Sequence, residues 1–297
     1  MSSLDYKNFE KNNIHVLRQA QFIASMNVTF YLVISISKII IGSVAKSTAL
    51  KADGYNGATD TLAYLIIIMG IAFAKRPKNQ EHRFGYAKAE TISTLITSIL
   101  IIETSFWVIW KGIIDWINNS SEKPDSLAAV IGIGSGILTF TIFLLNNYFA
   151  KKIQSKPLLA SSEDQKWDSI TAVLTGLAIL ISELGFPWID KLTAIVIGLL
   201  MFRTGLFILN SSAFKLIDGF SNELLNQVKL ELEKFNQIEK IVKINGREYE
   251  NDIYISAIVK VDYHLTVNDT MDLTKNMKNY LQRKYGIFEL DVQYVSE

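Results

Sequence analysis

Cysteine is absent from this chain of 297 residues, and histidine occurs only three times. The absence of cysteine excludes disulfides, thiolate zinc sites and cysteine nucleophiles, so a metal must be held by oxygen or by one of the three histidines. A net charge is also lacking, because 30 Lys and Arg stand against 29 Asp and Glu. The balance of +1 gives no large charge to attract nucleic acid, and no nucleic-acid partner is expected. Any function must therefore reside in local sites.

Apolar residues, by contrast, are abundant and unevenly distributed. Hydrophobic residues make up 49% of the chain, the mean hydropathy is +0.21, and the apolar residues crowd into the first 213 positions. This composition excludes a small secreted scaffold and a disordered chain. It indicates a membrane protein with a soluble appendage.

Six segments reach the length of about 20 mostly apolar residues that a membrane-spanning helix needs. We place them at 16–42, 47–74, 86–114, 126–150, 158–184 and 187–213. A polar stretch with Lys7, Lys11 and Arg18 leads into the first apolar segment, which has no small-residue cleavage site, so we expect this segment to stay in the mature protein. The predicted fold is an α-helical membrane protein, with a cytoplasmic segment at 1–15 and a six-helix transmembrane bundle at 16–213.

The basic residues of the loops predict the orientation. The connection between the second and third spans and the one after the fourth span are rich in them: Lys75, Arg76, Lys78, Arg83, Lys88, Lys151, Lys152 and Lys156. The other three loops are poorer in basic residues. By the positive-inside rule both termini are cytoplasmic, and we expect a plasma (inner) membrane location.

Residues 214–297 have the pattern of a soluble domain. Apolar residues recur at helical spacing in 224–235 and 270–285, and they alternate with polar residues in 253–262 and 288–294. Asn245-Gly246 predicts a turn before the strand at 253. The order helix, strand, strand, helix, strand predicts a cytoplasmic α+β domain with its helices on one face of a small sheet. A domain of about 80 residues is marginal alone, so we expect it to pair with a second copy.

Polar side chains are rare inside the spans, where a charge costs at least about 2.5 kcal/mol. The acids and amides singled out among them are Asn27, Asp53, Asn56, Asp60, Glu103, Asp164, Asp168 and Glu183. Asn56 and Asp60 are four residues apart, as are Asp164 and Asp168, so each pair lies on one helix face. We expect no basic residue near them in sequence to neutralise them, which makes a divalent cation the natural partner and protons its substitute. The alternative is that they pack the helices together through hydrogen bonds.

Two further acids leave more than one interpretation open. Asp53 shares roughly the face of Asn56 and Asp60, so one interpretation is that it lines the exit path or relays protons. The other is that it is an acid at the helix N-terminus that satisfies the backbone N–H groups and the dipole of the first turn. Glu103 either belongs to a proton path or bonds a neighbouring helix. Gly132, Gly134 and Gly136 predict a small-residue face on the fourth span that lets helices approach closely.

Four motifs resemble the cation diffusion facilitator family of divalent-metal exporters. They are ALKADGYNGATD at 49–60, HRFGYAKAE at 82–90, EDQKWD at 163–168 and LIDG at 216–219. The resemblance covers nearly the whole chain and implies a homodimer with six spans and a ferredoxin-like cytoplasmic domain. It also implies that Asn56, Asp60, Asp164 and Asp168 form a transport site that exchanges cytoplasmic metal for protons across the lipid bilayer by alternating access, without a bound cofactor.

The residue types at this site resemble the manganese-exporting branch of the family. Zinc exporters usually place His before Asp in at least one pair, whereas this chain offers Asn and Asp. Imidazole favours zinc, copper and nickel, while carboxylate and amide oxygens suit manganese. We therefore expect Mn²⁺ as the transported ion, with Zn²⁺, Fe²⁺ or Co²⁺ as alternatives because four oxygens can bind each of them.

Two alternatives come from other classes of protein. An intramembrane metallohydrolase would need a cluster such as His-Glu-x-x-His, which the chain lacks, so we expect a secondary active transporter and not an enzyme. A non-transporting scaffold whose tail recruits partners predicts that Asp168→Ala has no phenotype.

The resemblance has two further implications. Opposite charges at Lys88 and Asp218 resemble a pairing that ties the family's dimers together below the membrane, and the alternative is two solvated charges. The loop between the second and third spans, where zinc members often carry metal ligands, offers Asn79, His82 and Tyr86. With only one strong donor among them, no metal site is expected there.

Overall fold

The computed structural model describes residues 26–74, 76–77, 79–82, 85–86, 88–118, 124–153, 156–249 and 252–295. The chain forms two compact units. One contains the residues up to Ile66 together with Thr97–Phe207, and the other contains Ile67–Ile96 together with Ile208–Glu297.

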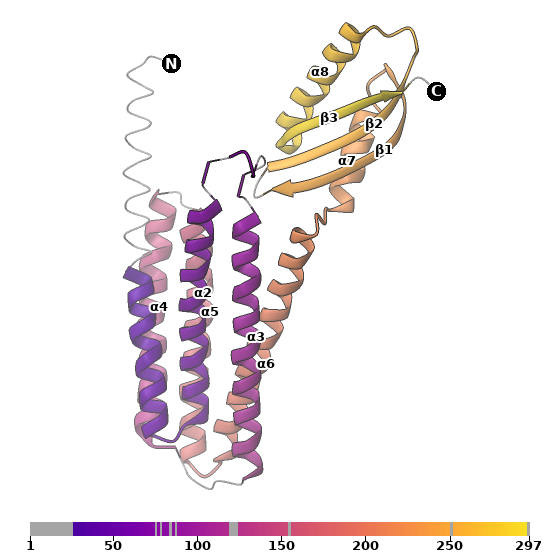
Figure 1. The fold of residues 1–297 in the computed structure, drawn as a ribbon. Coiled ribbons are helices and arrows are strands. Elements are labelled where there is room, and N and C mark those ends of the chain that lie inside the picture. Colours follow the sequence, from indigo (N-terminus) through magenta and orange to yellow (C-terminus); the bar gives the residue numbers. More distant parts are fainter. Residues whose placement is uncertain are drawn as a thin grey trace. The chain divides into compact units, whose positions relative to one another are not determined.

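Six long helices lie between residues 26 and 216 of the described ranges (Figure 1). They are Met26–Val44, α2 (Thr48–Ala74), α3 (Lys88–Ile117), α4 (Ser126–Ile153), α5 (Lys156–Glu183) and α6 (Trp188–Leu216). Five of them are long and apolar enough to cross a membrane. The exception is α5, which has the length but whose apolar sequence is interrupted by charged residues, among them Asp164 and Asp168. Six helices are therefore confirmed at the predicted places, five of them as candidate spans. Residues 1–25, which hold the predicted cytoplasmic segment at 1–15 and the start of the first predicted span, lie outside the described residues.

The exposed surfaces of these helices are strongly apolar. Val44 is 74% exposed, Phe207 is 74% exposed and Met69 is 70% exposed. Small residues such as Ala49 and Ser105 are buried instead. This distribution suits a lipid environment, in which helices associate through close packing of small residues and not by hiding large apolar ones.

Glycines lie at two close helix crossings in the first unit. A Cβ atom at Gly54 of α2 would lie 2.9 Å from the backbone nitrogen of Ile39, and one at Gly198 of α6 would lie 2.7 Å from Cγ1 of Ile109 on α3. These positions pair the helix Met26–Val44 with α2, and α3 with α6. Neither crossing has room for a larger side chain without a shift of the helices.

The predicted small-residue face of the fourth span is confirmed in part. A Cβ at Gly132 would lie 2.8 Å from Cα of Gly176 on α5, and one at Gly136 would lie 2.9 Å from the backbone nitrogen of Val173. For Gly134 the prediction is wrong, because no heavy atom of the described chain lies within 4 Å of its Cβ position. The spacing of Gly132 and Gly136, one turn apart, places them together on the α5 side of α4.

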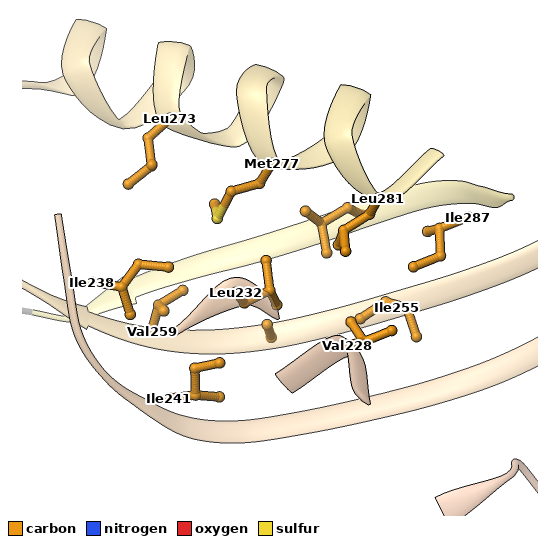
Figure 2. Close-up of a cluster of buried hydrophobic side chains, with 12 residues drawn as sticks. Val228, Leu232, Ile238, Ile241, Ile255, Val259, Leu273, Met277, Leu281 and Ile287 are labelled. Atoms are coloured by element: carbon orange, nitrogen blue, oxygen red, sulfur yellow. The ribbon is translucent and has the colours of Figure 1, made fainter. Parts of the chain in front are cut away.

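The C-terminal domain has the predicted order of elements: α7 (Asn222–Leu232), β1 (Ile238–Tyr249), β2 (Asp252–Val261), α8 (Val267–Tyr285) and β3 (Ile287–Val295). The sheet order is β1-β2-β3, with β1 antiparallel and β3 parallel to β2. Figure 2 shows Leu273, Met277 and Leu281 of α8 above the sheet, in one buried cluster with Val228 and Leu232 of α7. Both helices therefore cover the same face of the sheet, as the sequence predicted.

The predicted turn at Asn245-Gly246 is wrong. Both residues lie inside β1, where Asn245 pairs with Ser256 and Gly246 with Ile255, and the strand continues to Tyr249. A Cβ at Gly246 would lie 2.5 Å from the ring of Phe220. The lack of a side chain at Gly246 leaves room for the Phe220 ring, and the residue does not form a turn. A glycine inside a strand often marks such a close contact.

Candidate metal centre

The first half of the candidate site lies on α2. The Asn56 side chain donates a hydrogen bond from Nδ2 to Asp60 Oδ2 at 3.1 Å, so the two predicted ligands lie one turn apart on the same face. Both side chains are half-buried. In this orientation the amide nitrogen of Asn56 faces the carboxylate, and the amide must rotate before its oxygen joins Asp60 on one metal ion.

The second half lies on α5, where Asp164 is exposed and Asp168 is half-buried. Between them, Gln165 is buried and accepts a hydrogen bond at 2.7 Å from Asn146 of α4. The same amide nitrogen of Asn146 donates to Asn27 of the first described helix at 3.0 Å. This buried amide network fixes the rotation of α5 about its axis, and with it the direction of the two aspartates.

The structure brings the two halves into one region. Asp60 lies within electrostatic range of Asp164, and Asp168 lies within range of both. Among the residues that the structure describes, no three histidine or acidic side chains are close enough to hold one metal ion. The four predicted ligands are therefore neighbours across two helices, but they are not drawn into a closed coordination shell.

Tyr31 adds a group that the sequence analysis missed. Its hydroxyl is buried, has no hydrogen-bond partner among the described residues, and lies within electrostatic range of Asp60, Asp164 and Asp168. A buried hydroxyl without a partner is uncommon in native proteins. Tyr31 thus contributes a third helix to the surroundings of the candidate ligands. A single tyrosine in an apolar run gives no pattern from which this position follows.

Lys38 is the second residue that was missed, and it brings a basic group near these acids from a helix distant in sequence. Its ammonium group lies 2.7 Å from Asp53 Oδ2, and the two side chains are 8% and 6% exposed. Lys38 stands in the apolar run ISISKIIIG, inside a predicted span. A lysine at that depth was itself an indication that an acidic partner lies nearby.

The start of α2 excludes one of the two interpretations of Asp53, and its place on the exit path or in a proton relay stays a prediction. α2 begins at Thr48, and its first turn contains no acid, so the interpretation of Asp53 as a first-turn residue is wrong. Glu103 is exposed on α3 in the single chain. Its assignment to a proton path or to a helix contact remains a prediction.

The residues expected at the ends of the helices are also placed. Lys88 Nζ lies 3.0 Å from Asp218 Oδ1, so these charges pair within one chain, although both side chains are partly exposed. In the loop after α2, Asn79 accepts a hydrogen bond from the backbone of His82 and donates one to the hydroxyl of Tyr86. The His82 ring stacks on that of Tyr86 at 4.3 Å. These three side chains are occupied with one another.

Comparison with known proteins gives matches along most of the chain. The model of the cation efflux transmembrane domain matches residues 25–217, and that of the cation efflux protein cytoplasmic domain matches residues 220–294. The first range contains Asn56, Asp60, Asp164 and Asp168.

Three relatives illustrate the similarity. The manganese efflux system protein MneS of Bacillus subtilis is 29% identical over 271 residues, which cover 91% of this chain and 93% of the relative. The manganese efflux system protein MneP of the same organism is 23% identical over 266 residues, covering 87% and 89% of the two chains. The cation efflux system protein CzcD of an Alcaligenes species is 25% identical over 268 residues, covering 87% and 81%.

Proposed function

Given that the chain belongs to the cation efflux family and is a divalent metal cation efflux transporter, we propose that it moves Mn²⁺ out of the cytoplasm in exchange for protons. The observation that carries the proposal is the set of four oxygen-bearing side chains on α2 and α5, three of them carboxylates within electrostatic range of one another. The names of MneS and MneP, two manganese efflux proteins, support the choice of ion.

The donor set favours Mn²⁺ for a chemical reason. Asp60, Asp164 and Asp168 supply carboxylate oxygens, and Asn56 supplies an amide oxygen once its side chain rotates. Mn²⁺ binds more weakly than the later divalent ions of the first transition row, so a site for it gains selectivity by withholding the imidazole and thiolate ligands that those ions prefer. None of the four ligands is a histidine, and the chain has no cysteine.

Proton exchange follows from the same carboxylates. A carboxylate that binds metal must be deprotonated, so metal entering from the cytoplasm displaces protons from the three aspartates. When the helices rearrange to open the site to the other side, incoming protons compete with the metal for the same oxygens. Mutually exclusive binding at one site couples the two fluxes without a second binding site.

Orientation and assembly complete the proposal. The basic residues between α2 and α3 and after α4 support a cytoplasmic location for both termini, in a protein of the plasma membrane. The match of residues 220–294 to a family of dimerising cytoplasmic domains supports a homodimer. The Lys88–Asp218 ion pair then lies at the cytoplasmic boundary of each subunit.

Transport by purified protein in sealed vesicles tests the proposal. We expect Mn²⁺ flux into proteoliposomes only when a pH gradient is imposed, and we expect no flux in the Asp60→Ala variant. A parallel assay with Zn²⁺, Fe²⁺ and Co²⁺ measures the selectivity. Flux of Zn²⁺ alone would contradict the argument from the donor set, and flux without a pH gradient would contradict proton exchange. An Asp168→Ala variant that retains full function would support the scaffold alternative.

A further inference from the structure

The buried ion pair of Lys38 and Asp53 stands beside the candidate ligands but is not part of them. Its nitrogen and oxygen are 2.7 Å apart, and less than a tenth of either side chain is exposed. Asp53 precedes Asn56 by three residues on α2, and Lys38 comes from the helix Met26–Val44. A buried ion pair rarely adds stability over apolar residues of the same size, because the desolvation of two charges offsets their attraction. Its presence therefore calls for a role other than stability.

The helix crossing that holds the pair is tight. A Cβ at Gly54 would lie 3.0 Å from Cβ of Lys38, and one at Gly57 would lie 2.4 Å from the hydroxyl oxygen of Ser35. The glycines bring the backbone of α2 close to the first described helix at the level of Lys38. Because the lysine stem then runs along the α2 surface, its ammonium group is delivered to Asp53 and is held close to the candidate ligands.

The charges of the pair reach those ligands. Asp168 lies within electrostatic range of Lys38, Asp53, Asp60 and Asp164, and Asp60 lies within range of Asp53. The region thus contains four carboxylates and one ammonium group. Without Lys38, a divalent ion at the ligands would face one more unneutralised negative charge, and its release would become harder.

We propose that Lys38, held by Asp53, is a positioning residue that sets the charge at the transport site and thereby the affinity for the metal ion. The inference rests on the proposed function, because it assigns the strength of binding at the same four ligands. Lys38 does not touch the metal. It cancels the charge of Asp53 and keeps this carboxylate away from Asn56 and Asp60, so that metal binds firmly enough to load and weakly enough to leave.

Two single substitutions separate this role from a purely structural one. Lys38→Met leaves Asp53 as an additional negative charge, and we expect the Kd for Mn²⁺ to fall at least about tenfold. Asp53→Asn leaves an uncompensated ammonium group, and we expect the Kd to rise by a similar factor. The double substitution removes both charges together and should stay within about threefold of wild type. A role in packing alone predicts shifts in the same direction, or none.

Equilibrium binding of Mn²⁺ alone provides the readout. The six-line electron paramagnetic resonance spectrum of free Mn²⁺ is titrated with full-length protein in detergent at pH 8. Lys111→Met is the matched control, because Lys111 also forms an ion pair within a long helix, with Asp115 on α3. We expect this control to leave the Kd unchanged. Shifts in the same direction in both single variants, or a double variant as altered as either single one, would overturn the proposal.

A charge exchange keeps the test decisive if a single variant does not fold. Lys38→Asp combined with Asp53→Lys retains a buried pair but moves the cation onto α2, three residues from Asn56. We expect weaker Mn²⁺ binding by about tenfold or more, and an unchanged Kd would overturn the role of Lys38. The wild type separates the two proposals. If the wild type neither binds nor transports Mn²⁺, the proposed function fails. If the wild type binds Mn²⁺ but the charge variants leave the Kd unchanged, only the charge-setting role is refuted.

Discussion

The carboxylate of Asp190, at the start of α6, caps the first turn of α2 by accepting the backbone N–H of Thr48 at 2.7 Å. It also accepts hydrogen bonds from the Ser47 hydroxyl at 2.6 Å and from the backbone of Ala49 at 3.3 Å. The first turn of a helix has N–H groups without intrahelical partners, which a residue just before the helix usually satisfies. Ser47, just before α2, accepts the backbone N–H of Leu50 at 3.0 Å, and Asp190 adds an acceptor from another helix that joins the start of α2 to the start of α6.

Removal of this cap should destabilise the membrane domain. We expect Asp190→Ala to lower the free energy of unfolding by about 1–3 kcal/mol, because buried N–H groups and a buried hydroxyl lose their acceptor. Thermal unfolding of the detergent-solubilised protein, followed by tryptophan fluorescence, measures the change.

The matched control for this variant is Asp125→Ala. Asp125 caps α4 locally, by accepting the backbone N–H of Leu127 at 3.0 Å in an exposed position. Water can replace an exposed acceptor, so we expect a smaller effect than at Asp190. Equal effects would show that the link between α2 and α6 adds nothing to ordinary capping.

The crossing of α4 and α5 should tolerate no side chain at Gly176. A Cβ there would lie 2.7 Å from the backbone nitrogen of Ile133 and 3.1 Å from the carbonyl oxygen of Ala129. We expect Gly176→Val to separate the helices and to destabilise the protein by about 1–3 kcal/mol or more. Gly134→Val is the control, because its Cβ position is open among the described residues. Monodispersity on gel filtration after graded heating compares the two variants, and equal losses would contradict the described packing.

Local pattern was sufficient to predict the long helices and the order of the elements in residues 222–295. Apolar runs and alternation depend only on neighbours in sequence, and α8 even carries a capping box between Thr266 and Asp269. Asn245-Gly246 was misread because the same dipeptide that favours a turn also suits a strand facing the ring of Phe220. The choice between them is made by a tertiary contact, which a local pattern does not contain.

The candidate site was likewise predictable only where it depends on local spacing. The pairs Asn56 with Asp60 and Asp164 with Asp168 follow from helical spacing. The partners of the surrounding polar groups do not, because Asn146 bonds Gln165 and Asp190 bonds Thr48 across different helices. Such pairings depend on how the helices rotate and cross. Lys38 was within reach of the sequence analysis, since a lysine inside an apolar span already requires a partner.

The contact between α7 and α8 predicts acid sensitivity of the C-terminal domain. Glu231 accepts hydrogen bonds from Lys234 at 2.7 Å and from the hydroxyl of Tyr280, and Lys284 lies 2.9 Å from it. These contacts lower the pKa of Glu231 to about 2, and the hydrogen bond with Lys234 has the largest effect. Because the folded pKa lies below that of the unfolded chain, the stabilisation is present above about pH 4.5 and is lost as the pH falls toward about 2.

Digestion by pepsin tests this dependence in the full-length protein. At each pH between 4.5 and 2, the cleavage of residues 222–295 is compared between wild type and Glu231→Gln by mass spectrometry. We expect the variant to be cut faster at pH 4.5 and the difference to vanish near pH 2. Glu233→Gln serves as control, because Glu233 lies 4.0 Å from Lys229 in an exposed pair. A difference that persists at pH 2, or a control that behaves as Glu231→Gln does, would refute the assignment.

Substitution of Asn56 tests whether the amide excludes zinc. Asn56 lies one turn from Asp60 and is bonded to it at 3.1 Å, so a histidine at position 56 would aim an imidazole nitrogen at the same region. Because imidazole favours Zn²⁺ over Mn²⁺, we expect Asn56→His to raise the ratio of Zn²⁺ to Mn²⁺ transport by at least about tenfold. The flux of both ions into proteoliposomes is measured in parallel under the same pH gradient. Asn147→His, which places the same side chain on α4, is the matched control and should leave the ratio unchanged. An unaltered ratio in Asn56→His would mean that selectivity is set by the carboxylates or by the gating of the helices, because the imidazole would then be present without consequence.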